Sequence, residues 1–212
     1  MKNINNESWL KNLNSTGGNS PYYTWTTENF SIQGERPDIR CKILDNYPHL
    51  FFRKKVVDIG CNLGRISHHA IALGAELVYG VEQDKNTYIA AKRLRDLQNL
   101  SEKINFFNMS LAKEVPKIKV NTAICFSVLH HINPRDMVWD FLNNNVSDYV
   151  IVESKINESP HQSSYEEGDF WVFQSDSDMI SYILKKLSNF SYSSQIGISE
   201  RNRPILLFKK ND

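Results

Sequence analysis

A turn bounded by two glycines is the stretch of this sequence best suited to hold a ligand. The turn, Gly60–Gly64, follows Val56 and Val57, which favour a strand, and the acid Asp58. Glycine lets a backbone approach a ligand closely, and a helix that starts after such a turn presents unpaired N–H groups to a carboxylate or phosphate. We therefore expect a site for a small polar ligand between a strand and a helix.

Two other places carry groups capable of chemistry. Glu82 and Gln83 end the apolar run that starts at Leu77, and Glu82 lies roughly twenty residues beyond the first glycine, the interval after which an acid reaches a ribose in a βαβ unit. His130 and His131 follow a third apolar run and are candidates for a general base, because imidazole titrates near neutrality. The alternative is that they only orient the loop. Adjacent histidines diverge and have no acid three or four residues away, so no metal site is expected.

Alternating strand and helix patterns position these residues. The first strand is expected from Val56, with further strands over residues 77–84, 104–111, 121–132, 148–154, 191–199 and 203–209, and helices over 35–47, 66–73, 85–100 and 175–190. This alternation implies a parallel sheet with right-handed crossovers, in which ligands bind at the carboxyl ends of the strands. Asp58, Glu82, Ser110 and residues 126–131 all fall at those ends, so we expect them to meet at one site.

These motifs together resemble a known family. The run V-V-D-I-G-C-N-L-G resembles motif I of the class I S-adenosylmethionine-dependent methyltransferases, whereas a dinucleotide site would need glycine in place of Asn62 and Arg65. In that family the acid at the position of Glu82 binds both ribose hydroxyls, and the turn at the position of Ser110 contacts the adenine. The L-H-H-I run over residues 129–132 resembles the continuation of motif IV.

The resemblance implies a doubly wound α/β fold, with a mostly parallel seven-stranded sheet that ends in an antiparallel C-terminal hairpin. It implies one methyltransferase domain over residues 31–212, behind an N-terminal cap segment over residues 1–30, and S-adenosylmethionine as cofactor. Arg36, in a Q-G-E-R element, is expected either to reach the cofactor carboxylate or to lie on a solvated face, and the Phe126 ring to steady the sulfonium. The predicted cofactor-binding residues are Asp58, Gly60, Cys61, Asn62, Gly64, Glu82, Gln83, Ser110, Phe126 and Arg36.

The acceptor is less defined than the cofactor. The first hypothesis is transfer to an oxygen or nitrogen of a small-molecule or sugar-like acceptor. The alternatives are a transferase that modifies tRNA or another RNA, and a non-catalytic cofactor-binding subunit of a partner enzyme. The F-S-V-L run over residues 126–129 replaces the N-P-P-Y typical of exocyclic base methylation, and Cys125 lies inside a strand, which disfavours two base-methylating mechanisms.

The helix expected over residues 85–100 adds one further expectation about RNA. Its apolar residues are expected to face the core and its basic residues to face outward. The apolar residues are Ile89, Leu94, Leu97 and Leu100, and the basic ones are Lys92, Arg93 and Arg95. A basic stripe of this kind suits either an RNA surface or an ordinary solvated helix face.

Composition indicates a single globular domain. The chain has 212 residues, of which 41% are apolar and 23% charged, and its net charge of +1 calls for neither nucleic acid nor an acidic membrane. No run of signal-peptide or membrane-span length is found, so we expect a cytoplasmic protein. The three cysteines lack a CxxC spacing and are expected to be free thiols.

Two flanking segments remain. Residues 1–20 are expected to be disordered or a loose cap, and the aromatic residues over 21–30 either to pack in the core or to close over the site. The long polar stretch Lys155–Gln174 is expected to take part in substrate recognition, because long loops in compact domains are usually functional.

Overall fold

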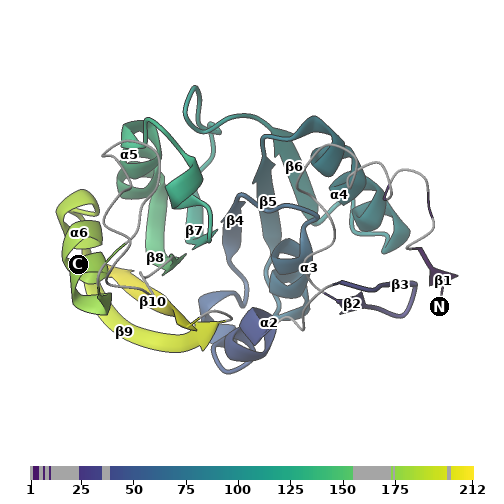
Figure 1. Cartoon of the computed structure of the whole chain (residues 1–212), viewed down its shortest axis with the longest axis horizontal. Helices are drawn as coiled ribbons and strands as arrows, with labels where there is room; N and C mark the ends of the chain where they lie inside the picture. The colour runs from purple at the N-terminus through teal and green to yellow at the C-terminus, as the bar shows by residue number, and fades with distance from the viewer. Residues whose placement is uncertain are drawn as a thin grey trace, which may run out of the picture.

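A seven-stranded sheet forms the centre of the molecule (Figure 1). The computed structural model describes residues 2–4, 7, 10, 24–34, 39–154, 173, 175–199 and 202–212. In spatial order, the strands are β6 (Ile104–Asn108), β5 (Leu77–Glu82), β4 (Lys55–Ile59), β7 (Val120–Phe126), β8 (Val146–Glu153), β10 (Arg203–Lys210) and β9 (Phe190–Ser199).

The direction of the strands confirms the predicted doubly wound fold. The first five strands in this order pair in parallel, whereas β10 runs antiparallel to both β8 and β9. From β4 the chain moves outward to β5 and β6, then returns to the other side of β4 with β7. The order of the strands therefore switches between β4 and β7, and ligands of open α/β sheets bind at the carboxyl ends of the strands beside such a switch.

Helices cover both faces of the sheet because its strands alternate their apolar residues between two cores. Val57 belongs to one buried cluster with Phe141 and Ile183, whereas its neighbour Val56 belongs to another with Ala70. The first face carries α5 (Asp136–Asn145) and α6 (Asp176–Lys186), and the second α2 (Ile39–Leu44), α3 (Arg65–Ala72) and α4 (Lys85–Leu97). Two short 3-10 helices, η1 (Pro48–Leu50) and η2 (Leu129–His131), complete the helical elements of the described ranges.

A small second sheet packs against α4. It consists of β1 (Lys2–Asn3), β3 (Phe30–Ile32) and β2 (Trp25–Thr26), in that spatial order, and lies at the right of Figure 1. Trp25 and Phe30 are buried in a third cluster with Leu94 of α4. Core packing therefore accounts for these two aromatic residues, while Tyr22 and Tyr23 lie outside the described residues.

The first described residues are ordered. Lys2–Asn3 pair with Phe30–Ser31, and Ile4 is 1% exposed, so the expected disorder was wrong for these residues, while the alternative of a loose cap stays a prediction. Ile4 contributes an apolar side chain to the third cluster. This was not predicted, because the residues around Ile4 in the sequence are polar. The strand β3 crosses the expected boundary between residues 30 and 31, and the division into a cap segment and one domain stays a prediction.

The helix α4 buries a different face from the one predicted. Its buried residues are Thr87, Ala90, Ala91 and Leu94, which repeat at helical spacing, whereas Ile89 and Leu97 are 37% and 44% exposed. Small alanines let the helix lie close to its neighbours, so size rather than hydrophobicity selects this face. The expected inward orientation of Ile89 and Leu97 was wrong, while that of Leu94 is confirmed.

Three other features of the fold bear on the expectations. Cys41, Cys61 and Cys125 are all free, as expected, and all three are buried. In the part of the chain that the structure describes, every helix is too short or too polar to serve as a membrane span. The stretch Lys155–Gln174 lies outside the described residues except for Phe173.

Candidate active site

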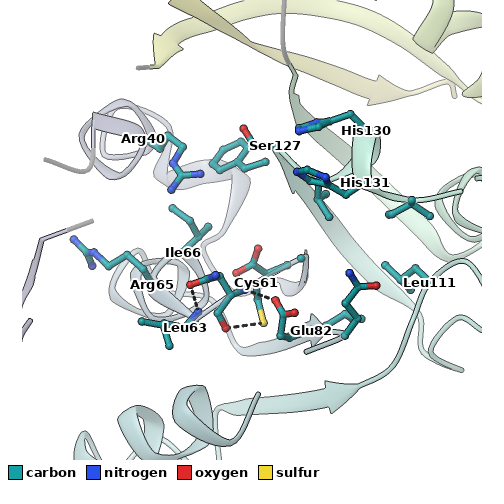
Figure 2. A pocket seen from close by; sticks show the side chains of 18 of the residues that line it. Arg40, Cys61, Leu63, Arg65, Ile66, Glu82, Leu111, Ser127, His130 and His131 are labelled. Carbon is teal, nitrogen blue, oxygen red and sulfur yellow. Dashed lines mark hydrogen bonds between the residues drawn. The ribbon is translucent and has the colours of Figure 1, made fainter. Parts of the chain in front are cut away.

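A cavity of about 530 Å³ opens at the carboxyl ends of β4, β5 and β7 (Figure 2). Its size is within the range of about 300–1,000 Å³ that is typical of small-ligand sites. It brings together most of the predicted site residues, namely Asp58, Gly60, Cys61, Asn62, Glu82, Gln83, Phe126, His130 and His131. The convergence of strand ends expected from the alternation is therefore found.

Two predicted residues of the described ranges do not line this cavity, and a third lies outside those ranges. Gly64 and Ser110 are absent from its wall, which their neighbours Leu63 and Met109 line instead. Arg36 lies outside the described residues. The roles expected for these three residues stay predictions.

The glycine turn depends on left-handed backbone conformations. Gly60 has φ 69°, Asn62 has φ 50° and Gly64 has φ 80°. A Cβ atom on Gly64 would stand 2.6 Å from Cζ of Phe106, so both the conformation and the space require glycine there. Asparagine adopts left-handed conformations more readily than most residues, and the Asn62 Oδ1 atom accepts a hydrogen bond from the Leu63 N–H at 2.8 Å. This explains how asparagine replaces a middle glycine in the turn.

Glu82 connects the end of β5 to this turn. Its Oε2 accepts a hydrogen bond from the Asn62 N–H at 3.0 Å, and its Oε1 accepts one from the Asp84 N–H at 2.8 Å. Burial raises the pKa of Glu82, although both N–H groups oppose the rise. Each carboxylate oxygen keeps a further lone pair, so Glu82 is a fixed acceptor at the cavity for ligand hydroxyl groups.

Asp58 is a buried carboxyl group at the cavity. It is 3% exposed, and its Oδ2 accepts a hydrogen bond from the Ser67 hydroxyl at 2.7 Å. Burial raises the pKa of Asp58 to about 6, and the charge of Glu82 adds to the rise, while the Ser67 hydrogen bond and the charge of Arg40 oppose it. A cation bound in the cavity would favour the ionised carboxylate.

Arg40 is a site residue that the sequence reasoning missed. It reaches the cavity from α2 with 8% exposure, and its Nη1 atom lies 3.8 Å from Oε2 of Glu153. Its Cζ atom lies 5.6 Å from the ring centroid of Phe126, within cation–π range. Arg40 follows Arg36 by four residues, and this spacing, which places two residues on one helix face, was the signal available for it.

A buried polar network around Glu153 was also missed. Glu153 ends β8 with 2% exposure, and its Oε2 accepts a hydrogen bond from the Ser127 hydroxyl at 2.8 Å, while its Oε1 accepts one from Ser199. The Ser127 Oγ atom in turn accepts a hydrogen bond from Nη1 of Arg203 at 2.6 Å. Ser127 and Arg203 both line the cavity, so the network supports one of its walls.

The two histidines lie side by side on η2. Figure 2 shows the two rings at the cavity. Their ring centroids are 4.0 Å apart, and His130 is buried whereas His131 is partly exposed. Burial lowers the pKa of His131, and the charge of Arg203 lowers it further. His131 is therefore neutral near pH 7, which is the form required of a proton acceptor.

The described ranges contain no group of three His, Cys, Asp or Glu side chains placed to hold a metal ion. The cavity instead combines two acidic residues with arginine and histidine side chains. Such an arrangement suits an organic ligand that carries hydroxyl and charged groups.

Comparison with known sequences gives two matches. Residues 57–148 match the family model described as "Methyltransferase domain". The chain is also similar to the ribosomal RNA small subunit methyltransferase A of Persephonella marina, with 34% identity over 80 residues. That alignment covers 36% of this chain and 30% of the Persephonella enzyme, so the chain spans less than a third of its length.

Solved structures resemble the fold over most of the chain. The magnesium protoporphyrin IX methyltransferase of Synechocystis PCC 6803 with bound SAH has a TM-score of 0.61, with 18% identity and coverage of 82% of this chain and 81% of that one. A SAM-dependent methyltransferase from Aquifex aeolicus has a TM-score of 0.64, with 11% identity and coverage of 81% and 89%. The [4+2]-cyclase SpnF has a TM-score of 0.66, with 12% identity and coverage of 95% and 92%. At these identities the likeness concerns the fold, which hosts more than one reaction.

Proposed function

We propose that the chain is a class I S-adenosylmethionine-dependent methyltransferase and that it transfers a methyl group to an oxygen or nitrogen atom of a small-molecule or sugar-like acceptor. The observation that carries the proposal is the single cavity in which the glycine turn and Glu82 face Phe126 and the histidine pair. One side has the groups expected for the cofactor, and the other has an aromatic ring and a proton acceptor.

Charge and position suggest how the cofactor would bind. Glu82 accepts from the ribose hydroxyls, and the Gly60–Gly64 turn lets the nucleoside approach the backbone. Asp58 binds the ammonium group of the methionyl part. Burial raises the pKa of Asp58, and the positive charge of the ammonium group would favour its ionised form. Arg40 binds the carboxylate of the same part, because guanidinium groups match carboxylates in shape and charge.

The adenine would lie beyond β5, toward the turn that follows β6. Met109 and Leu111 offer apolar side chains to the cavity there, suited to the faces of a ring system. Ser110 lies between them and keeps its proposed contact with the adenine edge. Gln83, which also lines the cavity, follows Glu82 and would lie near the same part of the cofactor.

The reaction would take place at the end of β7. Bound S-adenosylmethionine would supply a methyl group on a positively charged sulfur, and its transfer to a lone pair of the acceptor would leave a neutral thioether. The Phe126 ring would steady the positive sulfur, and His131 would take the proton of a hydroxyl or ammonium acceptor. Alignment of donor and acceptor can supply roughly 7–11 kcal/mol of barrier lowering, so positioning is the main task of the protein.

An RNA acceptor is the second candidate function. The 34% identity to a ribosomal RNA methyltransferase over 80 residues favours it. RNA binding through phosphate contacts would weaken steeply between 50 and 200 mM salt. Binding of a small acceptor that keeps its affinity over this range would favour the first candidate. Tight cofactor binding without turnover on either class would point to a non-catalytic subunit.

Calorimetric titration with S-adenosylmethionine and S-adenosylhomocysteine tests the proposal. We expect micromolar binding to the wild type and a loss of at least tenfold in Glu82→Ala, because the variant removes the acceptor for two hydroxyl groups. Glu76→Ala is the matched control, since Glu76 is an exposed acid just before the other end of β5. Absence of binding to both ligands would refute the proposed function.

A further inference from the structure

Arg203 places a guanidinium group on the side of the cavity away from the glycine turn. It is the first residue of β10, which runs antiparallel to β8 with Ile205 opposite Glu153. This reversed direction brings the start of β10 to the carboxyl ends of the parallel strands. Because β8 and β7 separate β10 from β4, Arg203 lies beyond the methyl end of the proposed cofactor site.

The contacts of Arg203 leave its charge without a carboxylate. Its Nη1 donates to the Ser127 Oγ at 2.6 Å, and its Nε is buried without an acceptor. Among the described residues, no Asp or Glu oxygen lies within 4.0 Å of its guanidinium nitrogens. The nearby carboxylate of Glu153 instead accepts from Ser127 and Ser199 and pairs with Arg40.

At this wall, within the described ranges, the charge of Arg203 has no carboxylate of its own. Arg40, another guanidinium group of the cavity, pairs with Glu153 and neighbours Asp58. The charge of Arg203 also reaches the base candidate, because it lowers the pKa of His131. An anion at this wall would accept the buried Nε–H and offset the charge of Arg203.

We propose that Arg203 binds an anionic group, a carboxylate or a phosphate, on the methyl acceptor. The inference rests on the proposed function, since it assigns the anion to the acceptor rather than to the cofactor. The cofactor carries one anionic group, its carboxylate, and Arg40 on α2 is the closer partner for that group because Arg40 also neighbours Asp58, the proposed ammonium partner. The guanidinium fork of Arg203 can bind two oxygens of one anion at once.

Small aromatic anions test the inference directly. Benzoate, phenylphosphate and the neutral benzamide are titrated, with and without saturating S-adenosylhomocysteine, while NMR follows the arginine Nε–Hε resonances. We expect a saturable shift of the Arg203 signal with at least one anion and none with benzamide, and a comparison of benzoate with phenylphosphate tells which anion class is preferred. Arg203→Gln should weaken anion binding at least tenfold, and Arg203→Lys, which keeps the charge, should weaken it less.

The controls separate this inference from the proposed function. Arg93→Gln removes an exposed arginine of α4, away from the cavity, and should leave anion binding unchanged. Arg203→Gln should bind S-adenosylhomocysteine with unchanged affinity. If the wild type does not bind S-adenosylhomocysteine, the cofactor assignment is refuted, but the anion titration without S-adenosylhomocysteine still tests the role of Arg203. Equal anion binding in wild type and Arg203→Gln, equal binding of benzamide, or displacement of the anion by S-adenosylhomocysteine would each overturn the inference.

Discussion

Asp58→Asn is expected to stabilise the ligand-free protein at neutral pH. The pKa of Asp58 rises from 3.8 to about 6 in the folded state, chiefly because of burial. The unfolded chain therefore loses this proton at lower pH than the folded protein, so between about pH 4 and pH 6 the free energy of unfolding falls as the pH rises. At 1.36 kcal/mol per pH unit, the full loss is about 3 kcal/mol above pH 6.

Asparagine avoids this loss at little structural cost. It cannot ionise, and its side-chain oxygen can still accept the hydrogen bond from Ser67. We expect the free energy of unfolding of Asp58→Asn to exceed that of the wild type by up to about 3 kcal/mol at pH 7.5, with the difference vanishing near pH 4. The same variant should bind S-adenosylhomocysteine more weakly, because the proposed ammonium partner has lost its charge.

Urea denaturation at pH 4, 5, 6 and 7.5 measures the difference. Asp140→Asn, on the exposed side of α5, is the matched control and should show no comparable pH dependence. The reasoning would be refuted by an Asp58→Asn variant that is less stable than the wild type at pH 7.5. A stability difference that stays constant down to pH 4 would refute it equally, because it would not arise from ionisation.

Three further predictions concern the cavity and the elements around it. Arg203→Gln should raise the pKa of His131, and an unchanged NMR titration of its imidazole would contradict the described electrostatics. Burial lowers the pKa of His68 to about 4. As the pH falls, the unfolded chain therefore binds the proton at higher pH than the folded protein, and the free energy of unfolding decreases between pH 6.5 and pH 4. His68→Phe should remove up to about 3 kcal/mol of this decrease, as measured by urea denaturation. Gly64→Ala should lower the free energy of unfolding by about 1–2 kcal/mol because of the left-handed backbone conformation. The close contact of the new Cβ atom with Phe106 should lower it further. Thermal denaturation in a Phe106→Leu background should recover only the contact part.

The fold and the wall of the cavity around the glycine turn were largely predictable from the sequence because their signals are local. The strand–turn–helix pattern around Gly60 and the apolar run before Glu82 each lie within a few residues. Parallel strands then bring such ends together without further information. The ends of individual strands were less predictable, since β7 stops at Phe126, where Ser127 adopts φ 51°.

The opposite wall of the cavity was not predictable because its residues come from distant parts of the chain. Arg40, Ser127, Glu153 and Arg203 meet only once the order and direction of the strands are known. Nothing near Arg203 in the sequence distinguishes it from an exposed arginine. The prediction of the buried face of α4 was wrong for a different reason. It was based on hydrophobicity, whereas the observed face is selected by the small size of its residues.

The reversed direction of β10 also determines where the protein can be attached to other molecules. Since Lys209 pairs with Tyr149 while Ile205 pairs with Glu153, the last strand runs away from the cavity toward the amino ends of the parallel strands. Asp212 therefore lies at the edge of the sheet opposite the ligand, at the end marked C in Figure 1. A fluorophore, surface anchor or fusion partner joined there leaves the cavity mouth open, so an immobilised form of this protein can be used for acceptor screening.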